Sequence, residues 1–527
     1  MGHGHRLRRL SALFLAGWLI WGYGCWLGLP TAPLPGDAPF TLDADQFTLL
    51  VRLAHVSDTH IVDEESPGRL AEFDGLVSSA WRPQEAYAAQ VLDGIIRAVN
   101  RYHQDIAPVD LLLHTGDAVD NAQKNELRWV IQVMEGQWVD PRSGPDDRDP
   151  GAVPDPLLDP HQPFQAEGLY TQGRHGSGPT IAWYAAVGNH DVYASGNFPI
   201  IEIRPGQLAS PLPLWVRPGL LLPVLLIPDG EWTNAFVSPA NPGPPPLLHM
   251  PVRVQPNPDR AFCTRRDILE AHFASSVGPP GHGFDSPGGG RTWYSRAVAA
   301  GVRLIVLDTT DVCLPIPTLP YPEGAIGEAQ LGWFRAELSA AAARGEWVIV
   351  ASHHPSESLH ELWGSAISGE AFRAVLNEHE NVVLHLAGHT HINRVFDRGG
   401  YVEIVTGSTL DYPQTGRIIE LRLRNGTGEL MVNYLTVSHR DVMDSLSGLR
   451  EVAYALAVAD AGVAAQKVAE KTRQTCPTRD GARQWLDGAP ADRTGCVVLK
   501  KGRQAYGRDR GSGGDSISAR WPLGGAD

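Results

Sequence analysis

Six short apolar stretches, each followed by polar residues, constrain the fold of this chain more than any other feature. Several are separated by amphipathic segments with the 3.6-residue period of a helix. Strands that alternate with helices favour an α/β fold. The strand-like stretches are residues 49–56, 109–113, 180–187, 302–307, 347–351 and 382–387, and the helical segments are 84–103, 327–344 and 369–378.

After residue 401 the pattern changes to consecutive strands. Three apolar stretches follow one another closely, at 401–406, 417–423 and 430–435. Asn425 and Gly426 separate the last two of these stretches. This pair predicts a hairpin turn, in preference to glycosylation at the sequon that Asn425 begins.

Two proline-containing stretches interrupt the α/β pattern. Residues 138–179 are dense in Pro, Gly and Asp, and residues 192–291 contain many prolines. Long insertions in compact domains tend to be functional or disordered, so we expect these two to form a cap over a functional site. The main domain is expected at 48–440, followed by a helical extension at 441–500 and a disordered tail at 501–527.

The N-terminus has the pattern of a targeting segment. Arg6, Arg8 and Arg9 precede a stretch from Leu10 to Gly36 that contains no charged residue. Residues 1–36 are therefore expected to be a signal peptide, with an N-terminal membrane anchor as the alternative. In both cases the folded part is exported: secreted, held in the cell envelope, or anchored to the membrane and facing outside.

Four of the five cysteines follow the targeting segment. An even number of cysteines in an oxidising compartment permits two disulfides, and four free thiols are the alternative. Cys476 and Cys496 are the local choice of pair, and the other two are Cys263 and Cys313.

The charge of the chain limits its partners. It has 44 Lys and Arg residues against 59 Asp and Glu residues, which gives a net charge of −15. Nucleic-acid binding depends on the neutralisation of phosphates by Lys and Arg, so no nucleic-acid partner is expected. An anionic substrate would need local positive charge, and bound cations could supply it.

Five clusters of polar residues directly follow strand-like stretches. In an open α/β sheet, ligands bind beyond the carboxyl ends of the strands, so we expect these clusters to meet in one crevice. Their carboxylates, amide and imidazoles suit Mn, Zn or Fe better than Ca or Mg. The clusters are Ser57-Asp58-Thr59-His60, Gly116-Asp117-Ala118-Val119-Asp120-Asn121, Gly188-Asn189-His190-Asp191, Ser352-His353-His354-Pro355 and Gly388-His389-Thr390-His391.

Two of these clusters repeat a spacing of two residues. Asp58 precedes His60 by two positions, and His389 precedes His391 in the same way. Alternate side chains of an extended segment point in the same direction, so each pair is expected to present two ligands together. Asp117 follows a glycine, and its two carboxylate oxygens could bridge two cations.

The order and spacing of the clusters resemble the calcineurin-like metallophosphoesterase superfamily, because the motifs D-x-H, GD, GNHD, H-x-P and GHTH all occur. The resemblance spans roughly residues 50–440, apart from the insertions. It implies a four-layer α-β-β-α sandwich of two mixed sheets that holds two metal ions, divalent or of mixed valence. One ion would be bound by Asp58, His60, Asp117 and His391, and the other by Asp117, Asn189, His353 and His389.

The resemblance also implies a mechanism, in which a hydroxide that bridges the two ions attacks phosphorus. His190 resembles the family histidine that donates to the leaving-group oxygen, and Asp120 resembles the aspartate that orients it, so these two residues are expected to pair. Asn121 stands where protein phosphatases of the family have a phosphate-binding arginine, which argues against that activity. Asn121 and His354 remain candidates for contact with the substrate.

Other polar residues near the clusters have simpler interpretations. His55, His114 and His385 lie within or beside strands, and we expect them to be hydrogen-bonded residues of the core. The acidic run that begins at Asp63 is expected to be solvated.

These features favour an exported binuclear metal-dependent phosphoesterase that hydrolyses small phosphate mono- or diesters. Within the same class, the alternative is a nucleotide or nucleotide-sugar pyrophosphatase. From another class, the alternative is a non-catalytic, membrane-tethered binding scaffold on the same fold. The complete set of ligands argues against the scaffold, because a site without activity has no reason to keep every ligand together with His190.

Overall fold

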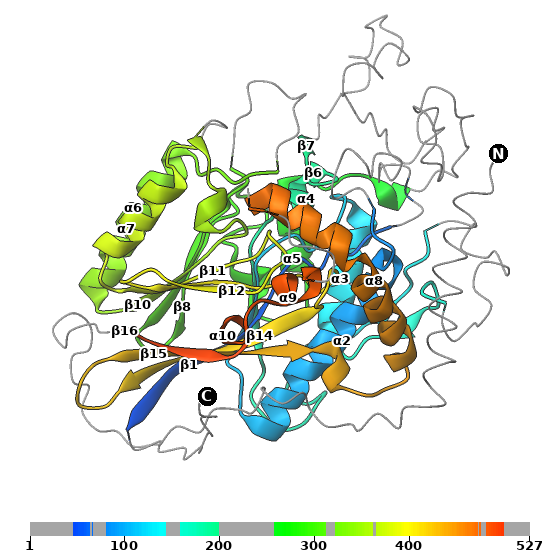
Figure 1. Ribbon diagram of the computed structural model, residues 1–527, viewed down its shortest axis with the longest axis horizontal. Helices are drawn as coiled ribbons and strands as arrows, with labels where there is room; N and C mark the ends of the chain where they lie inside the picture. Colours follow the sequence, from blue (N-terminus) through cyan, green and yellow to red (C-terminus); the bar gives the residue numbers. More distant parts are fainter. Residues whose placement is uncertain are drawn as a thin grey trace, which may run out of the picture.

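Two six-stranded mixed sheets form the centre of the structure (Figure 1). The computed structural model describes residues 46–63, 66, 81–143, 159–199, 258–311, 322–361, 365–472, 474–475 and 481–499. Across the first sheet, the strands are β16 (Gly495–Leu499), β15 (Leu430–Ser438), β14 (Thr415–Arg424), β1 (Phe47–Val56), β2 (Leu111–His114) and β5 (Ala182–Ala185).

The second sheet is built in the same way from later parts of the chain. Its strands, in order across the sheet, are β12 (Arg394–Asp397), β13 (Val402–Val405), β11 (Val382–Ala387), β10 (Trp347–Ala351), β9 (Val302–Val306) and β8 (Tyr294–Ala299). Strands β9, β10, β11 and β13 are parallel, as are β1, β2 and β5 of the first sheet. Their carboxyl ends carry the polar clusters.

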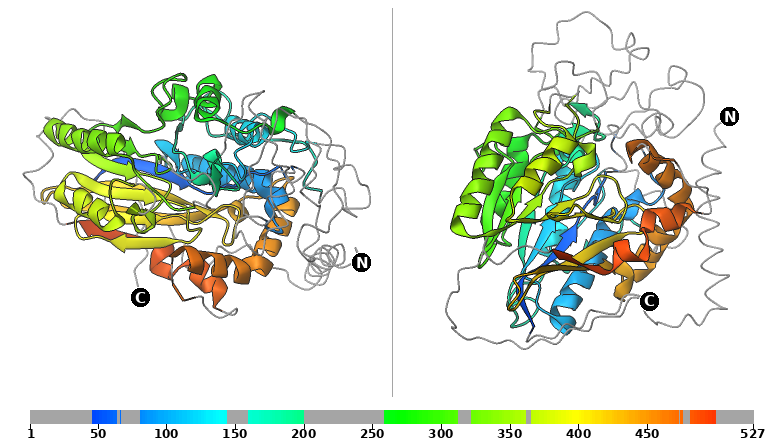
Figure 2. Two further views of the ribbon diagram at one scale, coloured as in Figure 1. Left: turned by 90° about the horizontal axis from the view of Figure 1, so that it is seen from above. Right: turned by 60° about the vertical axis from the view of Figure 1, so that its left-hand side comes forward.

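Helices cover the outer faces of both sheets, which makes the four-layer α-β-β-α sandwich that the resemblance implies. Helices α6 (Glu328–Arg344) and α7 (Gly369–Glu378) pack on the second sheet, and α2 (Ala88–Arg101) and α3 (Lys124–Glu135) pack on the first. Figure 2 shows the later helices α8 (Ser447–Thr472) and α9 (Ala482–Asp487) on the opposite side of the molecule from α6.

The residues of β9 show how the sequence pattern builds these layers. Leu304 and Val306 belong to the core that lies between the two sheets. Ile305 and Leu307 instead join Phe334 of α6 in a second hydrophobic cluster. Because successive strand residues point to opposite faces, a continuous apolar stretch identifies a strand that is covered on both sides.

The predicted strands and helices are all present. Strands β10 and β11 and helix α7 begin and end at the predicted residues. The segment predicted as one helix at 84–103 is divided into a 3₁₀ turn (Glu85–Tyr87), α2 and a π-helical turn (Tyr102–Ile106). The predicted hairpin also forms, since Leu423 pairs with Leu430 and Gly426 has a left-handed φ of 88°.

The described parts of the two insertions contain short elements. In the first, β3 (Trp138–Val139) pairs with β4 (Phe164–Gln165). Helix α4 (Asn189–Val192) ends where the second begins. The second contains β6 (Tyr193–Ala194), β7 (Phe198–Pro199), α5 (Arg265–Ala274) and 3₁₀ turns at Pro258–Arg260 and Pro280–Gly283. Residues 144–158 and 200–257 lie outside the described residues, and so do the expected targeting segment 1–36 and the expected tail 501–527.

The segment 441–500 is less uniformly helical than expected. It contains α8, α9 and α10 (Pro490–Arg493), but it ends in β16, which pairs with β15 at the edge of the first sheet. Two further 3₁₀ turns occur at Ser356–Ser358 and His439–Asp441. In the part of the chain that the structure describes, no helix is both long and apolar enough to cross a membrane.

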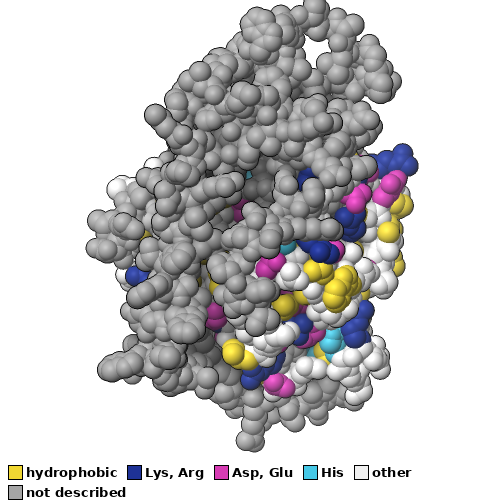
Figure 3. Space-filling view, turned by 90° about the vertical axis from the view of Figure 1, so that its right-hand side faces the viewer, with side chains coloured by type: hydrophobic (Ala, Val, Ile, Leu, Met, Phe, Trp, Pro, Cys, Tyr) yellow, Lys and Arg dark blue, Asp and Glu magenta, His cyan; other side chains and the backbone are white. Residues whose placement is uncertain are grey.

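The surface beside α8 is chemically mixed. On this side of the molecule, hydrophobic, acidic and basic side chains of the described residues are interspersed (Figure 3).

The cysteines do not follow the disulfide expectation. Cys263 is a buried free thiol and Cys496, on the edge strand β16, is an exposed one. The expected disulfide between Cys476 and Cys496 is therefore wrong for this structure. Cys313 and Cys476 themselves lie outside the described residues.

Candidate metal centre

The five polar clusters converge where the parallel strands of both sheets end. Asp58 follows β1, Asp117 follows β2 and Asn189 follows β5, while His353 follows β10. His389 and His391 follow β11. All seven proposed ligands are buried, with at most 4% of each residue exposed. The clusters therefore meet in one place, as expected, and both sheets contribute to it.

Five of the seven proposed ligands have a left-handed backbone. Among the proposed ligands, φ is 53° at Asp58, 43° at His60 and 51° at Asp117. It is 67° at His389 and 58° at His391. Residues other than glycine rarely adopt such values, which cluster at functional sites.

This backbone corrects the prediction that the two-residue spacing presents paired ligands from an extended segment. The turn at His389 and His391 sends the two imidazoles to different places. His391 joins Asp58 and His60, whereas His389 joins His353 and His354. The geometric reason given for pairing His389 with His391 is therefore wrong, because the two imidazoles face different groups of side chains.

Asp58, His60 and His391 form the first ligand set. Asp58 Oδ1 lies 3.1 Å from His391 Nε2 and 3.8 Å from His60 Nε2. The two Nε2 atoms are 3.0 Å apart. One carboxylate oxygen and two imidazole nitrogens thus face a common point, as the ligands of a divalent metal would.

Asp117 connects the first set to the second. Its Oδ2 lies 3.1 Å from His353 Nε2 and 3.8 Å from His60 Nε2. Its Oδ1 accepts a hydrogen bond from the backbone N–H of His190 at 2.8 Å. One oxygen is therefore fixed by the protein while the other lies between the two sets of histidines.

Asn189 and His389 complete the second set. The Nδ2 of Asn189 donates to the carbonyl of Gly196 at 2.9 Å, which leaves Oδ1 as the possible ligand atom. Within the described residues, this buried oxygen has no hydrogen-bond partner. A buried polar atom without a partner requires an explanation, and a bound ion supplies one.

A layer of hydrogen-bond acceptors orients the histidines. The Nδ1 of His60 donates to Asp120 Oδ1 at 2.9 Å, and that of His391 to Asp411 Oδ2 at 2.6 Å. His353 donates through Nδ1 to the carbonyl of Thr115 at 2.9 Å. Such contacts fix the tautomer and leave Nε2 as the metal-binding atom.

Asp191 fastens two of the ligand loops together. Its carboxylate accepts from the backbone N–H groups of Gly188, Asp117, Ala118 and Val119 at 2.7 to 3.2 Å. Burial, with the neighbouring charge of Asp117, raises the pKa of Asp191 to about 7. Sequence reasoning did not assign this residue a role.

Opposite charges are concentrated at the bridging carboxylate. Burial by itself lowers the pKa of His353, but the carboxylate of Asp117 raises it to about 9. Burial raises the pKa of Asp117, but His353 and His190 hold it below its usual range. The negative charge that attracts a proton to His353 would equally attract a cation.

Glycines allow the loops to approach one another. A Cβ on Gly388 would lie 1.8 Å from Ser57 Oγ and 2.3 Å from Asp58 Oδ2. A Cβ on Gly188 would lie 2.2 Å from Asp117 Oδ1. The glycines of the GNHD and GHTH motifs are therefore needed for close approach of the backbone to ligands.

His190 and Asp120 are neighbours, but their contact differs from the predicted one. The Nδ1 of His190 donates to the main-chain carbonyl of Asp120 at 2.6 Å, and the carboxylate Oδ1 is 3.5 Å away. That carboxylate instead accepts from His60 and from Arg82. Burial lowers the pKa of His190 to about 4.

Asn121 and His354 are held by internal hydrogen bonds. Asn121 Oδ1 accepts from the backbone N–H of Ser195 at 2.8 Å. His354 bonds Thr309 Oγ1 through Nδ1 at 2.7 Å and the carbonyl of Pro322 through Nε2 at 2.9 Å. These bonds hold both side chains in place, and their contact with substrate stays a prediction.

The three histidines expected in the core are hydrogen-bonded there. His55 contacts the hydroxyls of Thr115 and Thr406, at 2.8 and 2.7 Å. His114 contacts the Thr59 hydroxyl at 3.3 Å, and His385 contacts the Ser352 hydroxyl at 2.9 Å.

The expectation for Asp63 is wrong. Asp63 is only 1% exposed. Its Oδ2 accepts hydrogen bonds from the Asn125 side chain at 2.6 Å and from the Arg260 side chain at 3.0 Å. Asp63 thereby ties the end of the first ligand loop to α3 and to the second insertion. Proximity to other acidic residues in the sequence was a misleading signal.

Arg82 and Asp411 are the main residues that sequence reasoning missed. Asp411 follows β13, which lies parallel to β11, so the rule that identified the other clusters could have found it. Arg82 follows none of the strand-like stretches of the sequence, and no pattern in the sequence indicates its position.

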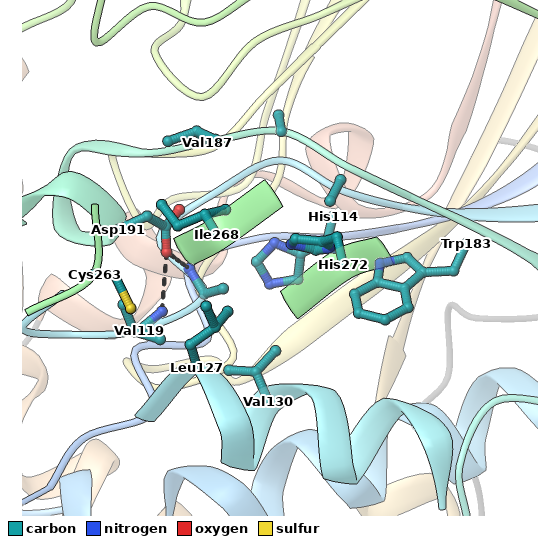
Figure 4. A pocket seen from close by; sticks show the side chains of 13 residues that line it. His114, Val119, Leu127, Val130, Trp183, Val187, Asp191, Cys263, Ile268 and His272 are labelled. Carbon is teal, nitrogen blue, oxygen red and sulfur yellow. Dashed lines mark hydrogen bonds between the residues drawn. The ribbon is translucent and has the colours of Figure 1, made fainter. Parts of the chain in front are cut away.

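A small cavity lies behind the Asp117 loop and is separate from the ligand sets (Figure 4). His114, Val119, Trp183, Asp191 and Cys263 are among the residues that line it. None of the proposed ligands lines this cavity.

The chain is similar to known proteins in two comparisons. A family model described as calcineurin-like phosphoesterase matches residues 51–234. The crystal structure of a dimetal phosphatase from Danio rerio is similar to this chain at 15% sequence identity, with a TM-score of 0.37, and the match covers 74% of this chain and 100% of that chain. No curated protein matches the sequence.

The fold and the convergent carboxylates and imidazoles define a metal-dependent hydrolase. The family match extends from β1 through the Asp117 and Asn189 loops, and the histidines of the second sheet complete the same site. Over residues 51–234 the chain is similar to the calcineurin-like phosphoesterases, and its site is that of a hydrolase that acts on phosphoric ester bonds.

Proposed function

We propose that the protein is an exported enzyme that uses two metal ions to hydrolyse small phosphate mono- or diesters. The observation that carries the proposal is the position of Asp117 Oδ2, which lies between His353 Nε2 and His60 Nε2 at 3.1 and 3.8 Å. A carboxylate placed between two sets of imidazole nitrogens suits two cations that share it.

The donor atoms fit first-row divalent metals. The first ion would be held by Asp58, His60, Asp117 and His391, and the second by Asp117, Asn189, His353 and His389. Mixed nitrogen and oxygen donors favour Mn, Zn or Fe over Ca or Mg. When bound, two such ions would polarise the phosphoryl oxygens and lower the pKa of a water molecule towards neutrality.

His190 is the residue of this chain that would move a proton. Its Nδ1 is committed to the carbonyl of Asp120, so Nε2 is left to face the leaving-group oxygen. Positioned acid–base catalysis of this kind contributes roughly 10² to 10⁴-fold to the rate. Asp120 supports His190 through its backbone and His60 through its carboxylate.

Export is part of the proposal and is supported by the N-terminal sequence. Three arginines followed by the uncharged stretch 10–36 have the order of a signal peptide or anchor. The test is fractionation of cells that express the full chain with a C-terminal tag. Recovery of the protein in the medium or envelope supports export, and recovery in the cytosol contradicts it.

The experiment for the activity is a panel of phosphomonoesters, phosphodiesters and pyrophosphates, assayed after reconstitution with Mn, Zn or Fe. Asn189→Ala is expected to lose bound metal, since it removes an oxygen ligand. His190→Ala is expected to keep its metal but to lower kcat by roughly 10² to 10⁴-fold.

Two variants at the far end of α7 serve as matched controls. Asn377→Ala and His379→Ala remove the same kinds of side chain, at or beyond the last turn of that helix, where no proposed ligand lies. They are expected to keep wild-type metal content and turnover. Equal activity in the wild type, Asn189→Ala and His190→Ala would refute the assigned roles.

A further inference from the structure

A buried arginine lies between two carboxylates that orient proposed metal ligands. Arg82 is 2% exposed. Its Nη1 donates to Asp120 Oδ1 at 3.0 Å, and its Nε lies 3.2 Å from Asp411 Oδ1 in an ion pair. One guanidinium group therefore spans both carboxylates.

Each of these two carboxylates also accepts a hydrogen bond from a histidine. Asp120 Oδ1 accepts from His60 Nδ1 at 2.9 Å, and Asp411 Oδ2 accepts from His391 Nδ1 at 2.6 Å. The Nε2 atoms of the two histidines are 3.0 Å apart. The five side chains thus form a closed ring, in which Arg82 lies opposite the first ligand set.

We propose that Arg82 is a positioning residue, which sets the spacing and direction of His60 and His391 for the first metal ion. The inference rests on the proposed binuclear centre. In this proposal, Arg82 acts on the two histidines through Asp120 and Asp411, the two carboxylates that it contacts.

The geometry of arginine explains why this position requires it. A guanidinium is planar and presents its donors in a fixed fork, so two carboxylates that bind it are held at a set separation. Lysine offers a point charge on a flexible stem, which can meet one carboxylate well but does not fix two. Without a cation, two buried carboxylates would also repel each other.

The second ligand set is oriented by other groups. His353 is held by the carbonyl of Thr115, and Asn189 by the carbonyl of Gly196. Neither contact involves Arg82 or its two carboxylates. Loss of Arg82 should therefore affect the first site selectively, and removal of such supporting contacts typically lowers metal affinity 10- to 100-fold.

The test compares Arg82→Gln, Arg82→Lys and a matched control, Arg52→Gln, as full-length proteins. Arg52 is also 2% exposed and pairs with Glu420 at 2.8 Å. Glu420 keeps a second arginine partner, Arg422, at 2.7 Å. Arg52 precedes Asp58 by six residues of β1, roughly 20 Å at the rise of a strand.

The readout is titration of each metal-free protein with Mn²⁺, followed by equilibrium binding and by electron paramagnetic resonance. The resonance spectrum distinguishes a magnetically coupled pair of ions from a single ion. Circular dichroism and thermal unfolding of the metal-free proteins report folding. These measurements do not depend on catalytic activity.

We expect the wild type and Arg52→Gln to bind two ions as a coupled pair. Arg82→Gln should show a 10- to 100-fold weaker first site, an unchanged second site and the spectrum of a single ion at intermediate Mn²⁺. Arg82→Lys preserves the charge and provides a test if Arg82→Gln fails to fold. Its affinity for the first ion should lie between those of the wild type and Arg82→Gln.

Two results would overturn the inference. One is a coupled pair of wild-type affinity in Arg82→Gln, and the other is equal weakening of both sites in Arg82→Gln and Arg82→Lys, which would indicate general structural damage. A wild type that binds no metal would instead refute the proposed function itself.

Discussion

Three of the four proposed histidine ligands use their two ring nitrogens for different purposes. At His60, His353 and His391, Nδ1 is bound to an oxygen of the protein, so that Nε2 faces the centre. The proposed proton donor His190 follows the same rule through the carbonyl of Asp120. For each of these histidines, the acceptor that sets the direction of the reactive nitrogen lies on another loop than the histidine itself.

Gly196 gives a test at the level of one residue. Its carbonyl accepts from Asn189, its φ is 65°, and an added Cβ would lie 2.1 Å from His190 Nε2. We predict that Gly196→Ala displaces His190 and lowers kcat by about 100-fold, the scale of a 1 Å misplacement. Steady-state kinetics on the metal-loaded enzyme measure the change.

Gly399→Ala is the matched control for Gly196→Ala. Gly399 has a similar left-handed φ of 83°, but an added Cβ would contact nothing within 4 Å. Both variants should lose some stability because alanine is strained at such φ values. Only Gly196→Ala should lose turnover, and an equal loss in both would contradict the contact with His190.

Individual residues also show which contacts could be predicted from the sequence. Asp58, Asp117, Asn189 and His353 were predicted to meet because each follows a strand whose carboxyl end lies at a shared edge. The contact between His190 and the carbonyl of Asp120 depends on side-chain rotation and on the path of a loop. Neither leaves a periodic signal in the sequence.

At the scale of elements, a buried carboxylate joins β13 to the chain that follows β10. Glu403 Oε1 accepts from the backbone N–H of Ser356 at 2.8 Å and lies 3.2 Å from His385 Nδ1. Its Oε2 accepts from Arg398 at 2.7 Å. Burial by itself raises the pKa of Glu403, but His385 and Arg398 lower it to about 2.

The depressed pKa predicts a pH-dependent contribution to stability. A carboxyl whose pKa is lower in the folded state than in the unfolded state, here about 2 against 4.5, stabilises the fold above the unfolded value. That contribution disappears as the pH falls towards 2. We predict that Glu403→Gln lowers the free energy of unfolding at pH 7 by about 3 kcal/mol.

Urea unfolding at pH 7, 5 and 3 tests this prediction. The difference between wild type and Glu403→Gln should be largest at pH 7 and should shrink at pH 3. Glu357→Gln is the control, because Glu357 also pairs with Arg398, at 3.0 Å, but its side chain is 49% exposed. A difference that is constant across these pH values would contradict the explanation.

Buried strands were easier to predict than exposed ones. β10 is entirely apolar, β11 is apolar apart from His385, and both strands are fully buried; their ends matched the prediction. β16 follows a helical segment and has an exposed, alternating pattern, so the 441–500 extension was expected to be helical. Its strand character comes from pairing with β15, which is a tertiary contact.

At the scale of the whole molecule, the C-terminal extension supports the metal centre from outside. Ile392 directly follows the proposed ligand His391 and packs in one cluster with Ala465 of α8 and Leu486 of α9. The carbonyl of Leu486 accepts from the backbone N–H of Asn393 at 3.3 Å. Residues about 100 positions apart in the sequence thus fix the same loop.

Leu486→Ala tests this support. Leu486 is fully buried, and we predict that its truncation lowers the free energy of unfolding by roughly 2–5 kcal/mol. Because the cavity adjoins Ile392, the affinity of the first metal site should also fall. Chemical unfolding of the metal-free protein and Mn²⁺ titration give the two quantities.

Leu338→Ala separates general destabilisation from a specific effect on the site. Leu338 is equally buried, but it belongs to the cluster between α6 and the second sheet. It should cost similar stability and leave metal affinity unchanged. A fall in metal affinity of the same size in both variants would mean that the extension has no particular role at the centre.

The central claim is that Asp117 lies between two bound metal ions. The most direct measurement is an anomalous difference map from crystals of the full chain loaded with Mn²⁺. We predict two peaks on either side of Asp117, one beside His60 and His391 and the other beside His353 and Asn189. A map with no peak there, or with a single peak that excludes either set of histidines, would contradict the account.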